Sequence, residues 1–124
     1  MDKFTIVIPV YNEAKNLKIL IPKIYKQLKN EKFELIVVDD DSPDHTWQVA
    51  LQLTSNYPHL RVMRRIREKG LSTAVIRGWQ AAKGEILGVI DADLQHPPEV
   101  LLKLLQDYRS ILKNLPINFL KKKF

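Results

Sequence analysis

Glu85-Ile86-Leu87-Gly88-Val89-Ile90 is the stretch that decides the fold, and it runs directly into Asp91-Ala92-Asp93. An apolar run of this length is typical of a strand buried on both faces, the kind found in parallel sheets. The two carboxylates after it are spaced i and i+2. On an extended chain such residues point to the same side, with Cα atoms roughly 6.5 Å apart. The stretch therefore predicts a buried parallel strand that ends in two converging carboxylates.

These carboxylates can bind one divalent cation. Asp91 and Asp93 supply the first oxygens, and Gln95 continues the same spacing with a carbonyl oxygen. Mg²⁺ or Mn²⁺ fits, because hard ions take oxygen ligands, use one or two carboxylates and keep positions open for substrate phosphates. The alternative is an acidic turn that caps the following helix. The three residues alone leave both interpretations open.

Three further strand-and-helix pairs precede this stretch. The expected strands cover residues 3–10, 33–38, 60–63 and 85–90. Helices are expected to begin at Asn12, Ser42 and Ser72, which are residue types that cap helices, and a fourth helix opens at Pro97. Gly78 allows the third helix to approach the sheet closely. This alternation predicts an α/β fold with an open, mostly parallel sheet and helices on both faces.

Each expected strand is followed by polar side chains. These segments are residues 11–13, 39–41, 64–69 and 91–95. Because ligands of open parallel sheets bind beyond the carboxyl ends of the strands, the segments predict one shared site. Acidic strand ends and a basic loop suit a nucleoside diphosphate with its metal, where Lys69 or a neighbouring arginine neutralises phosphate charge. Neither Gly-x-Gly-x-x-Gly nor a P-loop pattern follows the first strand, which disfavours dinucleotide oxidoreductases and P-loop NTPases.

Composition describes an ordinary globular chain. Its 124 residues fit one domain, and 45% hydrophobic with 27% charged residues is the usual balance for a soluble protein. The absence of cysteine excludes disulfide frameworks and thiolate metal sites. The start does not resemble a signal peptide, and no run of about eighteen apolar residues occurs, so we expect a cytoplasmic protein.

The formal net charge of +6 is unevenly distributed. Residues 109–124 carry five lysines and arginines and no acid, so the rest of the chain is nearly neutral. This pattern disfavours a broad nucleic-acid surface. We expect residues 109–124 to form a divergent basic tail, either disordered or in contact with an anionic bilayer.

Four linked motifs resemble the family 2 inverting glycosyltransferases of the GT-A fold, most closely the dolichol-phosphate (polyprenyl-phosphate) mannosyltransferase branch. The motifs are Ile-Pro-Val-Tyr-Asn-Glu at 8–13, Val-Val-Asp-Asp-Asp-Ser-Pro-Asp at 37–44, Lys-Gly-Leu-Ser at 69–72, and Asp-Ala-Asp-Leu-Gln-His-Pro at 91–97. The resemblance covers residues 3 to 107. It implies a Rossmann-like GT-A domain over residues 1–108 that binds a nucleotide sugar.

The resemblance also assigns site residues. Those implied to surround the nucleoside are Pro9, Tyr11, Glu13, Val38 and Asp40. Those implied to line the diphosphate and the metal are Asp91, Ala92, Asp93 and Gln95, of which Asp91, Asp93 and Gln95 are the expected metal ligands. The implied reaction transfers mannose or another hexose from a nucleotide sugar, GDP-mannose in this branch, to a polyprenyl or dolichyl phosphate at the cytoplasmic face of a membrane.

After Asp107 the family pattern breaks, and the acceptor-binding half is not recognisable. We therefore expect a C-terminally truncated transferase. The alternative is a nucleotide-diphosphate and metal binding module without turnover. A flavodoxin-like phosphoacceptor domain is a more remote interpretation, because it needs an acidic pair after the first strand, where this chain has Tyr11-Asn12-Glu13.

Overall fold

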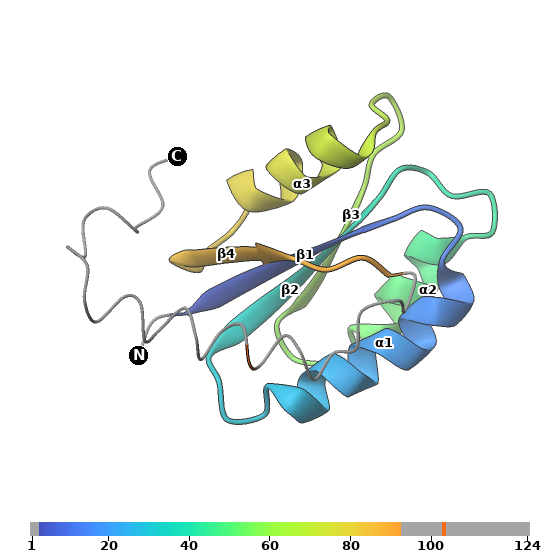
Figure 1. Ribbon diagram of the computed structural model, residues 1–124. Coiled ribbons are helices and arrows are strands. Elements are labelled where there is room, and N and C mark those ends of the chain that lie inside the picture. Colours follow the sequence, from blue (N-terminus) through green and yellow to red (C-terminus); the bar gives the residue numbers. More distant parts are fainter. Residues whose placement is uncertain (1–2, 93–102, 104–124) are drawn as a thin grey trace.

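The structure, a computed structural model, describes residues 3–92 and Lys103 and contains a four-stranded parallel sheet in the order β3-β2-β1-β4 (Figure 1). The strands are β1 (Phe4–Val10), β2 (Phe33–Asp39), β3 (Leu60–Arg64) and β4 (Ile86–Val89). The helices are α1 (Ala14–Gln27), α2 (Thr46–Leu53) and α3 (Leu71–Gln80). Alternating strands and helices thus give the predicted parallel α/β architecture.

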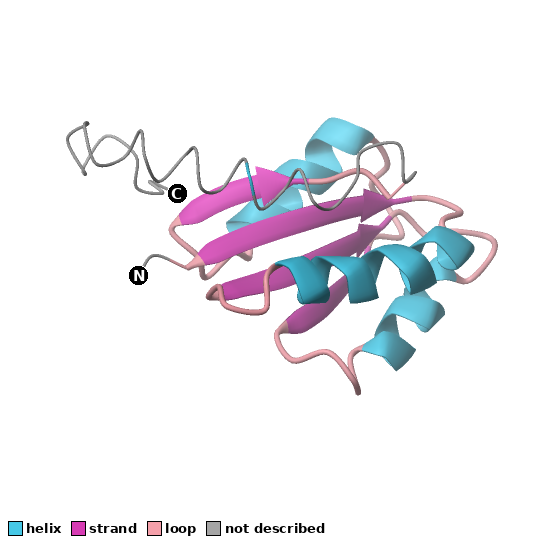
Figure 2. Cartoon of the chain, turned by 60° about the horizontal axis from the view of Figure 1, so that its bottom comes forward, coloured by secondary structure: helices cyan, strands magenta, loops and turns pink. Residues whose placement is uncertain are grey.

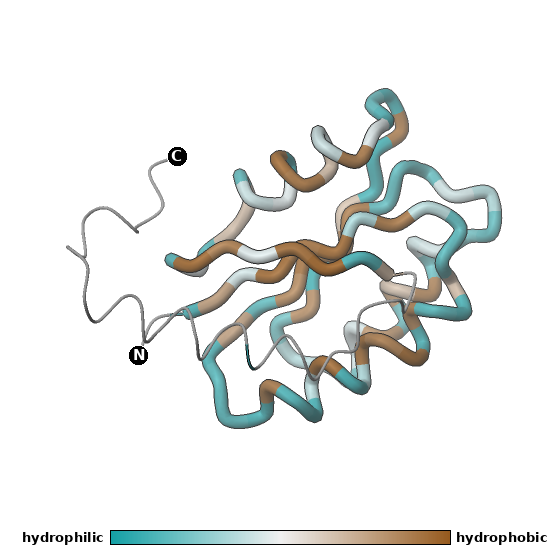
Figure 3. Tube along the Cα trace, in the orientation of Figure 1, coloured by the Kyte–Doolittle hydropathy of each residue, from teal (hydrophilic) through white to brown (hydrophobic). Residues whose placement is uncertain are grey.

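The helices cover both faces of the sheet, as predicted. α1 and α2 lie on one face and α3 lies on the other (Figure 1). Side chains alternate between the two faces along a strand. Ile6 and Ile8 of β1 accordingly pack in the core under α1 and α2, whereas Val7 packs with Ala74 of α3. The strands form the hydrophobic centre, and hydrophilic residues concentrate in the loops (Figure 3).

Gly78 lets α3 lie directly on the sheet. A Cβ at this position would stand 2.7 Å from both Cγ atoms of Val7 and 3.2 Å from Cγ2 of Val38. No side chain larger than hydrogen fits there without moving the strand or the helix. The close approach that the sequence predicted at Gly78 is confirmed.

The predicted helix caps are wrong. Asn12 has φ 55° and lies two residues before α1, whose N-cap is Glu13. The Ser42 hydroxyl donates to Asp39, and α2 begins only at Thr46. Ser72 lies inside α3, which follows Gly70. In the first two cases the residues also bond across the fold: the Asn12 amide donates to the Ser42 hydroxyl oxygen, and the Asn12 side chain accepts from the Asp44 amide. Local sequence patterns do not reveal contacts this distant along the chain.

β4 is less buried than the sequence predicted. Val89 is 47% exposed, and Leu87 and Gly88 are half-buried. The described part of the sheet ends with β4, which pairs only with β1 there. An end strand has one neighbour, so its apolar run is covered less completely than that of a central strand. The run still forms the predicted parallel strand, which pairs with β1 from Phe4 opposite Ile86 to Val7 opposite Val89.

Residues 3–92 contain no helix that has both the length and the apolar character needed to cross a membrane. Of the predicted fourth helix from Pro97 the structure describes Lys103 alone, which is helical, and the basic tail 109–124 lies outside the described residues.

Candidate functional site

The carboxyl ends of the four strands lie along one edge of the sheet, because all pairings are parallel (Figure 2). Backbone hydrogen bonds continue beyond the strands at this edge. The Asp40 amide donates to the Val10 carbonyl at 3.4 Å, and the Arg65 amide donates to the Asp39 carbonyl at 2.7 Å. The predicted polar segments 11–13, 39–41 and 64–69 are therefore neighbours in space.

A pocket of about 330 Å³ opens at this edge. It lies beyond β1 and β2 and is closed on one side by the start of α3; its lining residues are Pro9, Val10, Tyr11, Asp40, Lys69, Gly70, Leu71 and Ala74. Tyr11 is 50% exposed, so its ring is available to a ligand. The structure thus brings together Pro9, Tyr11 and Asp40 of the predicted nucleoside set.

Two other members of that set lie elsewhere. Val38 is fully buried in the core beneath α3 and supports the pocket from below. Glu13 is half-buried at the N-terminus of α1, where its carboxylate accepts a hydrogen bond from Asn16 at 2.7 Å. Neither residue lines the pocket in this conformation.

Asp40 is held by a buried arginine that sequence analysis did not single out. Arg65 binds it with both ends of the guanidinium, from Nε to Oδ1 at 2.7 Å and from Nη2 to Oδ2 at 2.9 Å. The Gly70 amide donates to the same Oδ2 at 2.9 Å. These hydrogen bonds to Asp40 raise the pKa of Arg65 above its ordinary value. The ion pair fixes the carboxylate and ties the 64–70 loop to the pocket.

Arg64 is also held by an ion pair with a carboxylate. It donates to Asp41 from Nε at 2.8 Å, and its guanidinium lies 4.3 Å from the centre of the Trp47 ring. Arg64 and Arg65 therefore neutralise Asp41 and Asp40, and Lys69 is the basic residue of this loop that lines the pocket. The sequence shows two arginines at the end of one strand and acids at the end of another, but only the pairing of β2 with β3 shows that these groups are neighbours.

A hydrogen-bonded scaffold holds the loop after β1 against the loop after β2. Asp39 Oδ1 accepts from the Ser42 amide at 3.1 Å, and Ser42 Oγ accepts from the Asn12 amide at 2.9 Å. Burial raises the pKa of Asp39, and the Ser42 hydrogen bonds only partly oppose this effect. Asn12, Asp41 and His45 all have left-handed φ angles, between 55° and 61°. Such backbone concentrates where surrounding contacts over-determine the chain, as they do here.

The predicted metal and diphosphate residues are described only in part. Asp91 is exposed two residues after the end of β4, and Ala92 is buried in the core on the α1 side. Asp93 and Gln95 lie outside the described residues. Residues 3–92 contain no group of three or more potential metal-ligating side chains. The Asp91 carboxylate makes no ion pair with another described residue, and its oxygens suit a hard divalent cation.

Fold and site together define a Rossmann-like α/β protein of the GT-A class. The family model "Glycosyl transferase family 2" matches residues 5–113, and the chain belongs to this family. It is 53% identical over 104 residues to dolichol-phosphate mannosyltransferase from Pyrococcus furiosus, covering 84% of this chain and 29% of that protein. It is 38% identical over 107 residues to the Saccharomyces cerevisiae protein of the same name, and this match covers 84% of this chain and 40% of that protein.

A solved structure gives the same picture. Mannosyltransferase PcManGT from Pyrobaculum calidifontis, in complex with GDP-Man and Mn²⁺, superposes with a TM-score of 0.67 at 29% identity. The superposition covers 74% of this chain and 28% of that one. The chain thus spans less than half the length of the relatives that it matches.

Proposed function

We propose that this chain forms the donor-binding part of a glycosyltransferase that moves mannose, or another hexose, from a nucleotide sugar to a polyprenyl or dolichyl phosphate. The observation that carries the proposal is the pocket at the carboxyl edge, which joins Tyr11, Asp40 and Lys69 in a family 2 chain. The relatives named dolichol-phosphate mannosyltransferase favour mannose as the sugar and a lipid phosphate as acceptor, and the PcManGT complex with GDP-Man favours GDP-mannose as donor.

The nucleoside would lie in the pocket. The exposed Tyr11 ring offers a surface on which a base or ribose can pack. Asp40 already accepts three hydrogen bonds, two from Arg65 and one from Gly70. A carboxylate has about four lone-pair sites, so roughly one remains for an N–H of the base. Lys69 is placed to neutralise phosphate oxygens.

The diphosphate would extend toward the end of β4, where Asp91 is exposed. Asp91, with Asp93 and Gln95, would hold Mg²⁺ or Mn²⁺, which supplies charge stabilisation on the departing nucleoside diphosphate when bound. The acceptor phosphate is the nucleophile: its oxygen forms the new bond to the sugar carbon as the bond from sugar to diphosphate breaks. A phosphate monoester is largely ionised at neutral pH, so a strong side-chain base is unnecessary.

Calorimetry with GDP, UDP and their sugars, with and without Mn²⁺, tests the donor site. We expect metal-dependent binding that Lys69→Gln weakens about tenfold or more, because hydrogen bonds to charged groups contribute roughly 1.5–3 kcal/mol. Lys83→Gln is the matched control, since Lys83 is exposed before β4 and distant from the pocket edge. Asp91→Ala should remove the metal dependence. If the chain binds none of these nucleotides, the proposal is wrong.

Transfer of labelled mannose to a polyprenyl phosphate then separates a transferase from the alternative, a nucleotide and metal binding module without turnover. The chain spans less than half the length of its relatives. We therefore expect this chain alone to bind donor without efficient transfer, and robust turnover would contradict that expectation.

A further inference from the structure

α1 carries an unusual concentration of positive charge on its outer side. Residues 14–30 contain five lysines, at 15, 18, 23, 26 and 29, and no acidic residue. With 3.6 residues per turn, the four lysines within the helix lie on the side opposite its buried stripe, which consists of Leu17, Leu20, Ile21 and Ile24, and Lys29 follows in the turn after Gln27. All five are exposed, and exposed Ile19 lies among them with 46% of its surface accessible.

Repulsion among these lysines, and between the first of them and the helix dipole, lowers the stability of α1 as an isolated helix. Lys15 and Lys18 lie at the positive end of the helix dipole, and the first turn contains no acid. The spacing also puts Lys15 with Lys18, and Lys26 with Lys23 and Lys29, in repelling i, i+3 pairs. None of the ion pairs found within the described residues includes these lysines. Two carboxylates lie at the N-terminal end of α1, Glu13 at the N-cap and Asp44, whose Oδ2 accepts from the Ala14 amide at 3.3 Å, and neither makes an ion pair with these lysines among the described residues.

After Asp44, which lies beside the start of α1, the α2 side of this layer adds no further acid and adds apolar contact. α2 lies beside α1 on this face of the sheet, and residues 45–67 contain no acidic residue. Leu51 of α2 is 49% exposed. A lysine-rich surface with isolated exposed aliphatic side chains is the combination that binds the interface of an anionic bilayer.

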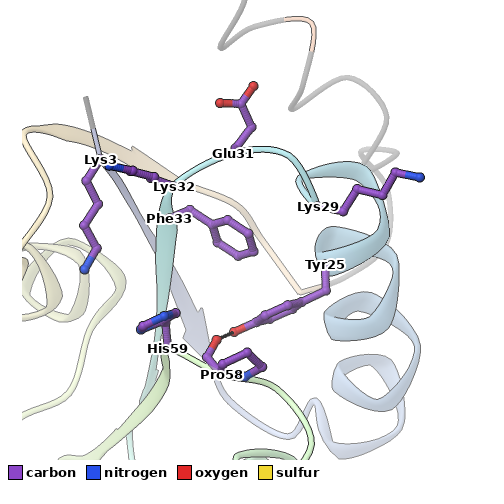
Figure 4. Close-up of a pocket in the computed structure, with 8 residues that line it drawn as sticks. All are labelled: Lys3, Tyr25, Lys29, Glu31, Lys32, Phe33, Pro58 and His59. Carbon is purple, nitrogen blue, oxygen red and sulfur yellow. Dashed lines mark hydrogen bonds between the residues drawn. The ribbon is translucent and has the colours of Figure 1, made fainter. Parts of the chain in front are cut away.

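At the C-terminal end of α1, the basic face leads into a hollow of about 580 Å³ (Figure 4). Lys3 and Lys29 stand on opposite sides of it, with the rings of Tyr25 and Phe33 between them. Lys32 and His59 also line it, against one acid, Glu31. This end of the face can therefore accommodate an anionic headgroup beside an apolar floor.

We propose that the outer face of α1, defined by Lys15, Lys18, Lys23, Lys26 and Lys29, docks this chain on an anionic lipid bilayer. The proposal is independent of the donor site, because it needs neither nucleotide nor metal. α1 begins three residues after Tyr11 of the pocket, so docking through this face would also hold the candidate site near the bilayer.

Co-sedimentation with vesicles tests the proposal. The chain should bind phosphatidylcholine vesicles that contain a third phosphatidylserine, and not phosphatidylcholine alone. Raising salt from 0.1 to 1 M shortens the screening length from about 10 to 3 Å and should abolish binding. Each lysine near an anionic surface accounts for roughly a fivefold change in partitioning. The triple variant Lys15→Gln/Lys18→Gln/Lys26→Gln should therefore bind roughly a hundredfold more weakly.

A variant with the same charge loss on another surface is the control. Arg67→Gln/Arg77→Gln/Lys83→Gln removes three exposed charges from the region around α3, and it should bind nearly as well as the unmodified chain. Gln resembles Lys in helix propensity, so circular dichroism should show both variants folded. The proposal is overturned if the α1 variant binds vesicles as well as the unmodified chain, if the control variant loses as much binding as the α1 variant, or if the chain binds neutral vesicles. An α1-dependent dimer that ignores vesicles would also overturn it, because the face would then be a protein interface.

Discussion

Removing one partner of the Asp40–Arg65 ion pair should strongly destabilise the chain. Both side chains are nearly buried, with 11% and 8% of their surface exposed. In Arg65→Met, Asp40 keeps only the Gly70 amide as donor, and its charge lies in a site that water barely reaches. Breaking a buried pair in this way costs roughly 3–5 kcal/mol, because the remaining charge is left uncompensated. The 64–70 loop should loosen at the same time.

Thermal unfolding followed by circular dichroism measures the effect. A loss of 3–5 kcal/mol corresponds to a fall in Tm of roughly 10–20 °C for a chain of this length. Asp40→Asn should also lower the free energy of unfolding. The double variant Asp40→Asn/Arg65→Met should lower it by about 0.5–3 kcal/mol less than the sum of the two single losses. Additive losses within about 0.5 kcal/mol would refute the reasoning, because two residues that act as one unit cannot be independent.

Three further predictions concern the core and the opposite edge. Gly78→Ala should destabilise by about 1–3 kcal/mol through overpacking against Val7, whereas Gly88→Ala, whose Cβ would meet only Ile6 at 4.0 Å, should be tolerated in the same melting experiment. Burial favours a raised pKa for Glu34, but hydrogen bonds from Thr5, the Lys83 amide and Arg61 outweigh it and lower the pKa below 4.5. The ionised carboxylate therefore stabilises the fold above that pH and loses its contribution as pH falls through the lowered value, so the stability difference from Glu34→Gln should shrink in acid. Burial, followed by the neighbouring Tyr57, raises the pKa of Tyr25 to about 12, so Tyr25→Phe should remove the latest phase of a spectrophotometric tyrosine titration.

The architecture was predictable from sequence because strand and helix segments alternate along the chain, and this alternation implies a parallel sheet with helices on both faces. Apolar runs without polar alternation indicated four parallel strands, and Gly78 indicated close packing of α3. The cap predictions failed because Ser42 and Asn12 bond to each other's loops, about thirty residues apart. The role of Arg65 was not predicted for the same reason. Its burial and its hydrogen bonds to Asp40 depend on strand order, which a local sequence pattern does not contain.

The acids at 39–41 show how strand order changes the interpretation of a charge cluster. In sequence they form a run of three acids at the end of a strand, and in the structure each has a separate partner: Asp39 binds Ser42, Asp40 binds Arg65 and Asp41 binds Arg64. The side of the pocket formed by β2 is thus largely neutralised by its own protein partners. Asp91, on the other side of β1, is exposed without an ion pair among residues 3–92. A hard cation would therefore be drawn toward β4, which leaves the β1–β2 side for the less charged nucleoside and orients the donor along the edge of the sheet.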